Sequence, residues 1–264
     1  MQKRVIFGGI ALLIFLPFLI FGGLPFHLFV GVLAMIGVSE LLKMRQLEVF
    51  SLEGVLTLLA AFVLSLPLGS YFSFLPLEAN LIAFALFVFA LLAGTVFNHS
   101  RYSIEEASFP IAASFYVGIG FHYLNIGRDA GLDKVLFALF LVWATDIGAY
   151  MVGRRIGKTP LLPAVSPNKT VEGSIGGLVS ALLVSFVFML IDAPVYSPHN
   201  FIVMLVLVVI FSAIAQFGDL VESAYKRHFG VKDSGKLIPG HGGILDRFDS
   251  LLFVFPLMYL FGLF

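Results

Sequence analysis

The sequence predicts an all-α integral membrane protein of about nine transmembrane helices with a cytoplasmic N-terminus. Three observations support this class: an apolar composition, a series of long uncharged runs, and an uneven distribution of lysine and arginine. Of the 264 residues, 59% are hydrophobic and 12% are charged, whereas a soluble domain is about half apolar and a quarter charged. A bilayer-crossing helix needs about 20 apolar residues, so the chain has room for about eight to ten spans joined by short loops.

The uncharged runs place the helices in order. No Asp, Glu, Lys or Arg occurs from Val5 to Ser39, and the turn residues Gly22, Gly23 and Pro25 divide this stretch into the first two spans. We interpret the N-terminal run as a retained span, because it is too long for a signal peptide and lacks a small-residue cleavage site. Further spans are predicted at residues 54–74, 80–98, 107–127, 135–153, 173–191, 200–218 and 250–264.

Lysine and arginine test this topology, because cytoplasmic loops carry an excess of both. With a cytoplasmic N-terminus, two of the 16 basic residues, Arg128 and Lys134, lie on the far side. The other 14 (16 minus 2) lie on the cytoplasmic side: Lys3, Arg4, Lys43, Arg45, Arg101, Arg154, Arg155, Lys158, Lys169, Lys226, Arg227, Lys232, Lys236 and Arg247. The two longest loops, 154–172 and 219–249, are therefore expected to face the cytosol together.

The chain leaves no room for a separate soluble domain, and we divide it near residue 130. Residues 1–130 hold spans one to five, which are predicted to act as a scaffold or a path for lipid. Residues 131–264 hold spans six to nine and both long loops, and are predicted to be catalytic. The formal net charge is zero, which gives no indication of a nucleic-acid partner. The absence of cysteine excludes disulfides and thiol chemistry.

Asp146 is an acid inside the sixth predicted span, in the segment LVWATDIGAY. A carboxylate at a helix centre costs about 2.5–3.5 kcal/mol on insertion scales, so it should face a polar cavity, a partner or a metal. Tyr150 and Arg154 follow one and two turns later on the same face, and a contact of Asp146 with either is the structural alternative. The Gly-rich and basic loop that follows can present backbone N–H groups, Ser166 and Lys169 to phosphate, although topology alone also favours a cationic loop here.

A second group of polar residues follows the eighth span and begins with Asp219. If that helix continues, Glu222, Ser223 and Lys226 lie on the same face as Asp219. Carboxylates at the end of an apolar span lie at the depth of lipid headgroups, where they can approach the phosphate of a lipid.

Asp246 and Asp249 stand three residues apart at the start of the ninth helix, so both carboxylates point the same way. With Asp219 they offer hard oxygen ligands, which suit Mg²⁺ bound together with substrate phosphates. The structural alternative is an interfacial ion pair between Asp246 and Arg247.

The turn before Asp246 contains His241, Gly242 and Gly243. One His without a second at ligand spacing does not make a zinc site, so we interpret His241 as a turn residue or a phosphate hydrogen-bond donor. The two glycines either supply positive φ angles or let the backbone approach a phosphate closely.

Two segments resemble the signature of the phosphatidate cytidylyltransferases, also called CDP-diacylglycerol synthases. Residues 223–249, SAYKRHFGVKDSGKLIPGHGGILDRFD, carry the longer motif. The stretch from Asp146 through SPNKTVEGSIGG is also similar, with Asn168 and Val171 where Lys and Trp are expected. Residues 1–130 match as a series of hydrophobic spans.

The resemblance implies a Mg²⁺-dependent transfer of CMP from CTP to phosphatidic acid, which yields CDP-diacylglycerol and pyrophosphate in phospholipid biosynthesis. It implies a metal site at Asp219, Asp246 and Asp249, with Asp146 as a further ligand and with room for a second cation. Lys226 is expected to be catalytic together with the three acids. The residues expected to bind the substrates are Ser166, Lys169, Ser223, Arg227, Lys232, His241, Gly242 and Gly243.

The expected partners are CTP, phosphatidic acid and the bilayer of a bacterial-type inner membrane, with the active site on the cytoplasmic side; a homodimer is compatible. One alternative is a CTP-dependent polyprenol kinase, which would attack the γ-phosphorus and release CDP. Another is a secondary transporter with Asp146 and Asp219 as ion-coupling residues. The acids cluster with basic residues on one side and no inverted halves are evident, which argues against the transporter.

Overall fold

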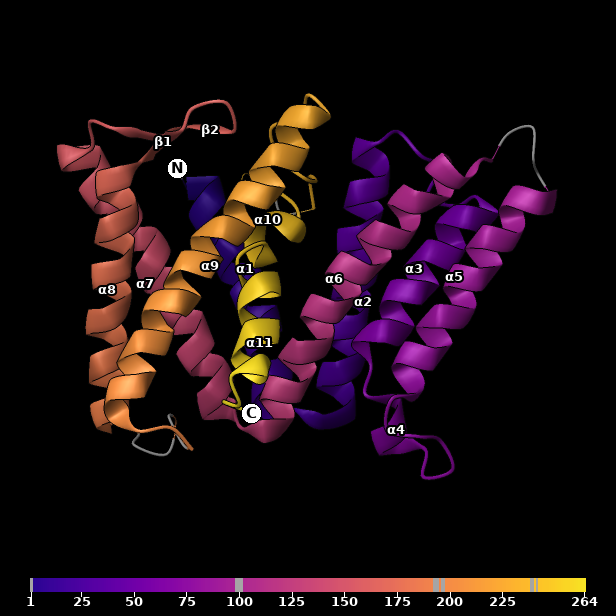
Figure 1. The fold of residues 1–264 in the computed structure, drawn as a ribbon, viewed down its shortest axis with the longest axis horizontal. Helices are drawn as coiled ribbons and strands as arrows, with labels where there is room; N and C mark the ends of the chain where they lie inside the picture. The colour runs from indigo at the N-terminus through magenta and orange to yellow at the C-terminus, as the bar shows by residue number, and fades with distance from the viewer. Residues whose placement is uncertain (1, 98–101, 192–194, 196–197, 238–239, 241) are drawn as a thin grey trace. The chain divides into compact units, whose positions relative to one another are not determined.

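A computed structural model describes residues 2–97, 102–191, 195, 198–237, 240 and 242–264. Each uncharged run that predicted a span contains a helix (Figure 1). The helices are α1 (Gln2–Phe21), α2 (Gly23–Met44), α3 (Leu52–Ser65), α4 (Leu68–Tyr71), α5 (Ala79–Phe97), α6 (Ile104–Ala130), α7 (Leu132–Ile156), α8 (Val171–Ile191), α9 (Phe201–His228), α10 (Leu245–Phe248) and α11 (Leu251–Leu260). The strands are β1 (Pro160–Leu162) and β2 (Ser166–Thr170).

Among the described residues, five helices are long and apolar enough to cross a membrane: α2, α5, α7, α8 and α9. Shorter apolar stretches lie in α1, α3 and α11, whereas α6 is long but less apolar. Large apolar side chains such as Leu183, Ile191 and Ile202 are exposed on the helix surfaces, as expected for groups that meet lipid. The chain is therefore a mostly helical, multi-pass membrane protein.

The described chain forms two compact units. Unit 1 comprises Met1–Asp129 and Asp233–Arg247, and unit 2 comprises Ala130–Lys232 and Phe248–Phe264. The loop that carries Asp246 thus belongs with the N-terminal helices, whereas Asp249 belongs with α7, α8, α9 and α11.

In unit 1, the predicted turn between the first two spans is a single residue between α1 and α2. Gly22 and Gly23 there adopt φ angles of 65° and 57°, a conformation that favours glycine. Arg128 at the end of α6 closes the C-terminus of α1, because its Nε and Nη2 donate to the Leu19 and Ile20 carbonyls at 2.5 and 2.8 Å. These donors satisfy carbonyls that the ended helix leaves without partners.

In unit 2, small residues bring α7 and α8 into close contact. A Cβ added to Gly176 would lie 2.5 Å from the Val152 Cβ, and a Cβ added to Gly177 would lie 2.8 Å from the Thr145 carbonyl oxygen. Such close backbone approach is typical of helices that pack inside membranes. It fixes the two helices that form one side of the cavity described below.

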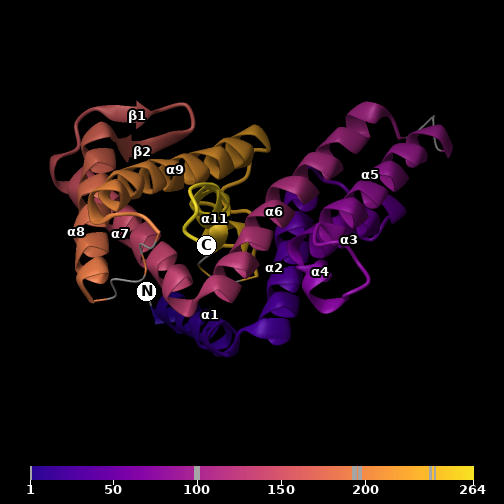
Figure 2. The ribbon, with the colours of Figure 1, turned by 60° about the horizontal axis from the view of Figure 1, so that its bottom comes forward.

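The predicted loop 154–172 contains a two-stranded antiparallel hairpin, β1 with β2, beside α8 and α9 (Figure 2). Glu172 in the first turn of α8 anchors it, since its carboxylate accepts hydrogen bonds from the Lys158 and Thr159 backbone N–H groups and from Thr159 Oγ1. Thr170 Oγ1 accepts from the Gly173 N–H at 3.1 Å and caps the same helix start. The hairpin therefore holds Lys169 in a defined place.

Candidate active site

Unit 2 contains a cavity of about 490 Å³. Its walls come from α7, the hairpin, the first turn of α8 and the C-terminal half of α9. Four charged side chains line it: Asp146, Arg154, Lys169 and Asp219. The cavity thus brings together the two stretches of unit 2 in which the sequence predicted functional residues.

Asp219 lies at the centre of the interactions in this cavity. Lys169 Nζ from β2 forms an ion pair with Asp219 Oδ2, and Ser223 Oγ donates to Oδ1 at 3.2 Å. The Lys169 and Asp219 side chains are 27% and 31% exposed, so a molecule in the cavity can reach both.

The predicted shared face of Asp146, Tyr150 and Arg154 is confirmed, since all three line the cavity from α7. Arg154 Nη1 donates to the Tyr150 hydroxyl at 3.2 Å. This bond does not involve Asp146, so the predicted contact of Asp146 with either residue stays a prediction. Because Arg154 is positively charged and borders the cavity, it can also bind an anion there.

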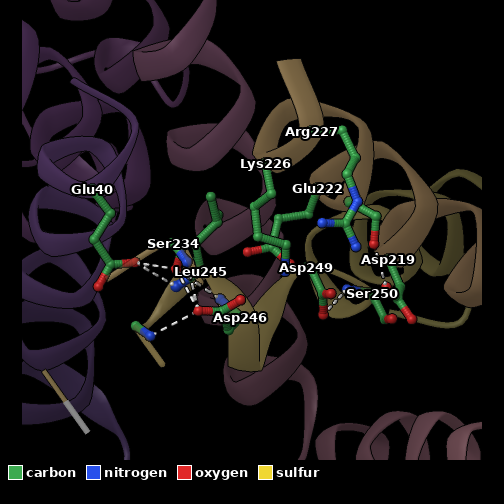
Figure 3. A network of polar contacts seen from close by, with 12 residues as sticks. Glu40, Asp219, Glu222, Lys226, Arg227, Ser234, Leu245, Asp246, Asp249 and Ser250 are labelled. Carbon is green, nitrogen blue, oxygen red and sulfur yellow. Dashed lines mark hydrogen bonds and ion pairs between the residues drawn. The ribbon is translucent and has the colours of Figure 1, made fainter. Parts of the chain in front are cut away.

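A second acidic group lies at the end of α9 (Figure 3). Glu222 is fully buried and accepts a hydrogen bond from Lys226 Nζ at 2.8 Å. Asp249 Oδ1 accepts from the Ser250 N–H at 2.8 Å. Burial, and then the nearby Asp219 carboxylate, raise the pKa of Asp249 to about 6, while Lys226 opposes that rise.

Whether Asp219 and Asp249 fit a divalent cation depends on the number of oxygen ligands near them. Within the described residues, no group of three or more His, Asp or Glu side chains could hold a metal alone. Mg²⁺, however, commonly uses one or two carboxylates and completes its shell with waters and substrate phosphates. Asp219 and Asp249 repel each other enough to affect the Asp249 pKa, and a cation relieves such repulsion. The donor set of unit 2 therefore fits Mg²⁺ that arrives with a nucleotide.

In unit 1, the described parts of the loop, residues 233–237 and 242–247, donate hydrogen bonds to two carboxylates (Figure 3). Asp246 Oδ2 accepts from Ser234 N and Gly243 N, each at 2.8 Å. Glu40 of α2 accepts from Ile244 N and Leu245 N, each at 2.9 Å. Ser234 Oγ lies 2.9 Å from a carboxylate oxygen of each acid, so the two acids share its single hydroxyl proton.

The structure separates the roles of the two glycines before Asp246. Gly242 has a φ of 84°, so the positive-φ interpretation holds there. Gly243 does not need positive φ; a Cβ on it would collide with the Glu40 carboxylate. The close approach at Gly243 is therefore to a carboxylate of the protein itself.

The other predicted substrate-binding residues are distributed as follows. Ser166 begins β2, and Arg227 Nε donates to the Val165 carbonyl at 3.2 Å, which links the end of α9 to the hairpin. Lys232 is exposed. His241 lies outside the described residues.

Comparison with known proteins covers the whole chain. The sequence model of the cytidylyltransferase family matches residues 2–264. The chain is 47% identical over 262 residues to the phosphatidate cytidylyltransferase of Staphylococcus saprophyticus, across 98% of this chain and 97% of that protein. Proteins of the same name from Staphylococcus haemolyticus and Staphylococcus aureus (strain COL) are 46% and 43% identical over 260 residues, with the same coverage. The chain belongs to the cytidylyltransferase family.

Membership of the cytidylyltransferase family confirms the resemblance and extends it to the N-terminal half, where the motifs alone showed hydrophobic spans. That half contains the residue that the sequence analysis missed, Glu40. A signal was present, since Glu40 is an acid within the apolar segment GVSELL, directly after the uncharged run. Gln216 was also missed; it lines the cavity and donates to the Ser174 carbonyl at 3.3 Å.

Proposed function

We propose that this chain is a membrane enzyme that transfers CMP from CTP to phosphatidic acid, forming CDP-diacylglycerol and pyrophosphate. The observation that carries the proposal is the cavity of unit 2, which is lined by Arg154 and by the ion pair of Lys169 with Asp219 and so offers cations for phosphate oxygens and a carboxylate for a metal. Relatives named phosphatidate cytidylyltransferase, 43–47% identical along nearly the whole chain, support the same reaction.

In the proposed reaction, a phosphate oxygen of phosphatidic acid attacks the α-phosphorus of CTP. A new P–O–P linkage forms, the bond between the α-phosphorus and the bridging oxygen breaks, and pyrophosphate leaves. The acceptor needs no strong general base, because a phosphomonoester has a second pKa near about 6 and is largely ionised at neutral pH. The protein therefore has to position two anions and stabilise charge.

We assign those tasks to named residues. Lys169 and Arg154 bind phosphate oxygens in the cavity. When the nucleotide binds, Lys169 leaves Asp219 and pairs with a phosphate of the nucleotide. Asp219 and Asp249 would hold Mg²⁺, and Asp146 and Asp246 are proposed as further ligands from their positions in the sequence. Bound Mg²⁺ would offset the negative charge of the phosphates and of the leaving pyrophosphate. Lys226 limits the repulsion among the buried acids through Glu222.

We further propose nine spans, a cytoplasmic N-terminus and a site on the cytoplasmic side. Helices at each predicted span and the distribution of 14 basic residues against two support this topology. A diacyl lipid leaves the bilayer at a cost of about 0.8 kcal/mol per exposed CH₂, so the reaction must occur at headgroup depth and still be open to cytosolic CTP. Acids at the ends of α9 and α10 meet both requirements.

The products test the proposal. Purified protein in detergent, given labelled CTP, phosphatidic acid and Mg²⁺, should release pyrophosphate and form a cytidine-containing lipid. The matched control replaces phosphatidic acid with diacylglycerol, which lacks the attacking phosphate and should give neither product. Release of CDP with transfer of one phosphate to a lipid alcohol would overturn the proposal in favour of a lipid kinase.

A further inference from the structure

Glu40 is a buried acid in a helix that is otherwise suited to lie in a membrane. Its side chain belongs to α2, it is 3% exposed, and the neighbouring Leu41 and Leu42 are 1% exposed. A buried carboxylate is costly unless donors satisfy it, and acids within membrane-spanning segments commonly mark functional sites.

The donors to Glu40 all come from one short loop. Ile244 N donates to Oε1, while Leu245 N and Ser234 Oγ donate to Oε2. The loop is also shaped to admit this carboxylate, since a Cβ on Gly235 would lie 2.8 Å from Glu40 Cδ and a Cβ on Gly243 would collide with the carboxylate. Glu40 thus fixes both ends of the described loop, near residue 234 and near residue 244.

The same loop holds Asp246 through a shared residue. The Ser234 hydroxyl lies 2.9 Å from both Glu40 Oε2 and Asp246 Oδ2, and the Ser234 N–H donates to Asp246 as well. Any displacement of Ser234 therefore changes the orientation of Asp246. Apolar packing could join α2 to a loop as firmly as a buried acid does, whereas the acid adds directional bonds that set the loop geometry.

We propose that Glu40 is a positioning residue for the transfer, which orients the Asp246 carboxylate by holding Ser234 and residues 243–246 in place. This inference rests on the proposed function for its effect on turnover, but the anchoring itself does not. Residues that orient a functional carboxylate usually change rate or metal affinity by about 10- to 100-fold when they are replaced.

The test uses the full-length protein in detergent and two readouts. Glu40→Gln keeps the shape of the side chain but turns an amide N–H₂ group toward backbone N–H donors, and Ser234→Ala removes the shared hydroxyl. The matched control is Glu105→Gln, an exposed acid in the first turn of α6 in the same unit. Hydrogen exchange is measured without substrate or metal, and the steady-state kinetics of pyrophosphate release are measured separately.

We expect Glu40→Gln to speed exchange in peptides covering residues 242–248 while α3 and α5 keep wild-type protection. It should lower kcat about 10- to 100-fold with the KM for CTP within about two-fold, and Ser234→Ala should show the same pattern more weakly. Unchanged exchange in the loop, or faster exchange spread equally over α3 and α5, would overturn the proposal. If the loop opens locally in Glu40→Gln but the wild-type protein makes no cytidine-containing lipid, the proposed function is wrong and the anchoring role of Glu40 stands.

Discussion

Glu40 of unit 1 differs from Asp219 and Glu222 of unit 2 in the charge of the groups that hold it. Within the described part of unit 1, the donors to Glu40 are uncharged: one hydroxyl and two backbone N–H groups. In unit 2, Asp219 is paired with Lys169 and Glu222 with Lys226. Backbone donors are fixed by the fold, whereas a lysine on a flexible stem can exchange one anion for another. We infer that unit 1 supplies fixed geometry and unit 2 supplies charge that responds to substrate.

Asp219→Asn tests the unit 2 side of this comparison and has the largest expected effect. The substitution removes the partner of Lys169 and a proposed metal ligand, so kcat/KM for CTP should fall about 100- to 1,000-fold. The free energy of unfolding should change by no more than about 1 kcal/mol, because both side chains of the pair are partly exposed. Pyrophosphate release and thermal melts in detergent measure the two quantities.

Asp133→Asn is the matched control, since Asp133 lies in the first turn of α7, away from the lining of the cavity. It should keep wild-type turnover. If Asp219→Asn instead lost several kcal/mol of stability, the pair with Lys169 would be a structural bond, and the contrast between the units would fail.

Gly243→Ala tests the unit 1 side and should change stability and activity together. A methyl group at this position collides with the Glu40 carboxylate, and forced overpacking costs about 1–3 kcal/mol. Because the collision displaces the loop that carries Asp246, we also expect a loss of turnover of about 10-fold.

Gly9→Ala in α1 is the control for this change, because a Cβ there meets no atom within 4 Å. It should keep wild-type turnover and leave stability unchanged or raise it by up to about 1 kcal/mol, because alanine favours a helix more than glycine does, while Gly243→Ala lowers both. Wild-type turnover and stability in Gly243→Ala would show that the loop adapts, and unit 1 would then not supply fixed geometry.

Features repeated at helical spacing could be predicted from the sequence. The shared face of Asp146 and Arg154, and the neighbouring positions of Asp219 and Ser223, follow from the periodicity of a single helix. Apolar runs likewise predicted where these helices begin to within a few residues, but α3 ends at Ser65 rather than near residue 74, and α9 continues past residue 218 to His228. These inferences are reliable because each depends on residues that are close in the chain.

Features that depend on distant partners could not be predicted. Glu40 and Ser234 are separated by 194 positions, and no local pattern connects an acid near the end of one span to a loop in the last part of the chain. The hairpin has the Gly and Pro content of a loop, and its conformation depends on the Glu172 carboxylate at the start of the next helix. Hydrogen bonds between residues that are distant in the chain determine both the position of Glu40 and the conformation of the hairpin, and the composition of a segment does not predict such bonds.

Asp249→Asn sharpens the comparison through a gain in stability. The pKa of Asp249 is raised from 3.8 to about 6, mainly by burial, so the folded protein binds this proton more tightly than the unfolded chain does. The free energy of unfolding therefore falls as pH rises through that interval, and the loss persists at higher pH. Asparagine carries no charge and still accepts from the Ser250 N–H, so it removes the penalty.

Melting curves in Mg²⁺-free buffer check this expectation. At about pH 8 the variant should melt above wild type by an amount that corresponds to at most about 3 kcal/mol, the penalty of a pKa raised from 3.8 to about 6, and at about pH 4 the two should nearly coincide. Turnover should be lost, since a proposed metal ligand is gone. A difference in melting temperature that stayed constant with pH would contradict the burial of an ionised Asp249. A stabilised but inactive variant would instead show that unit 2 keeps its acids at a cost to stability because the reaction requires their charge.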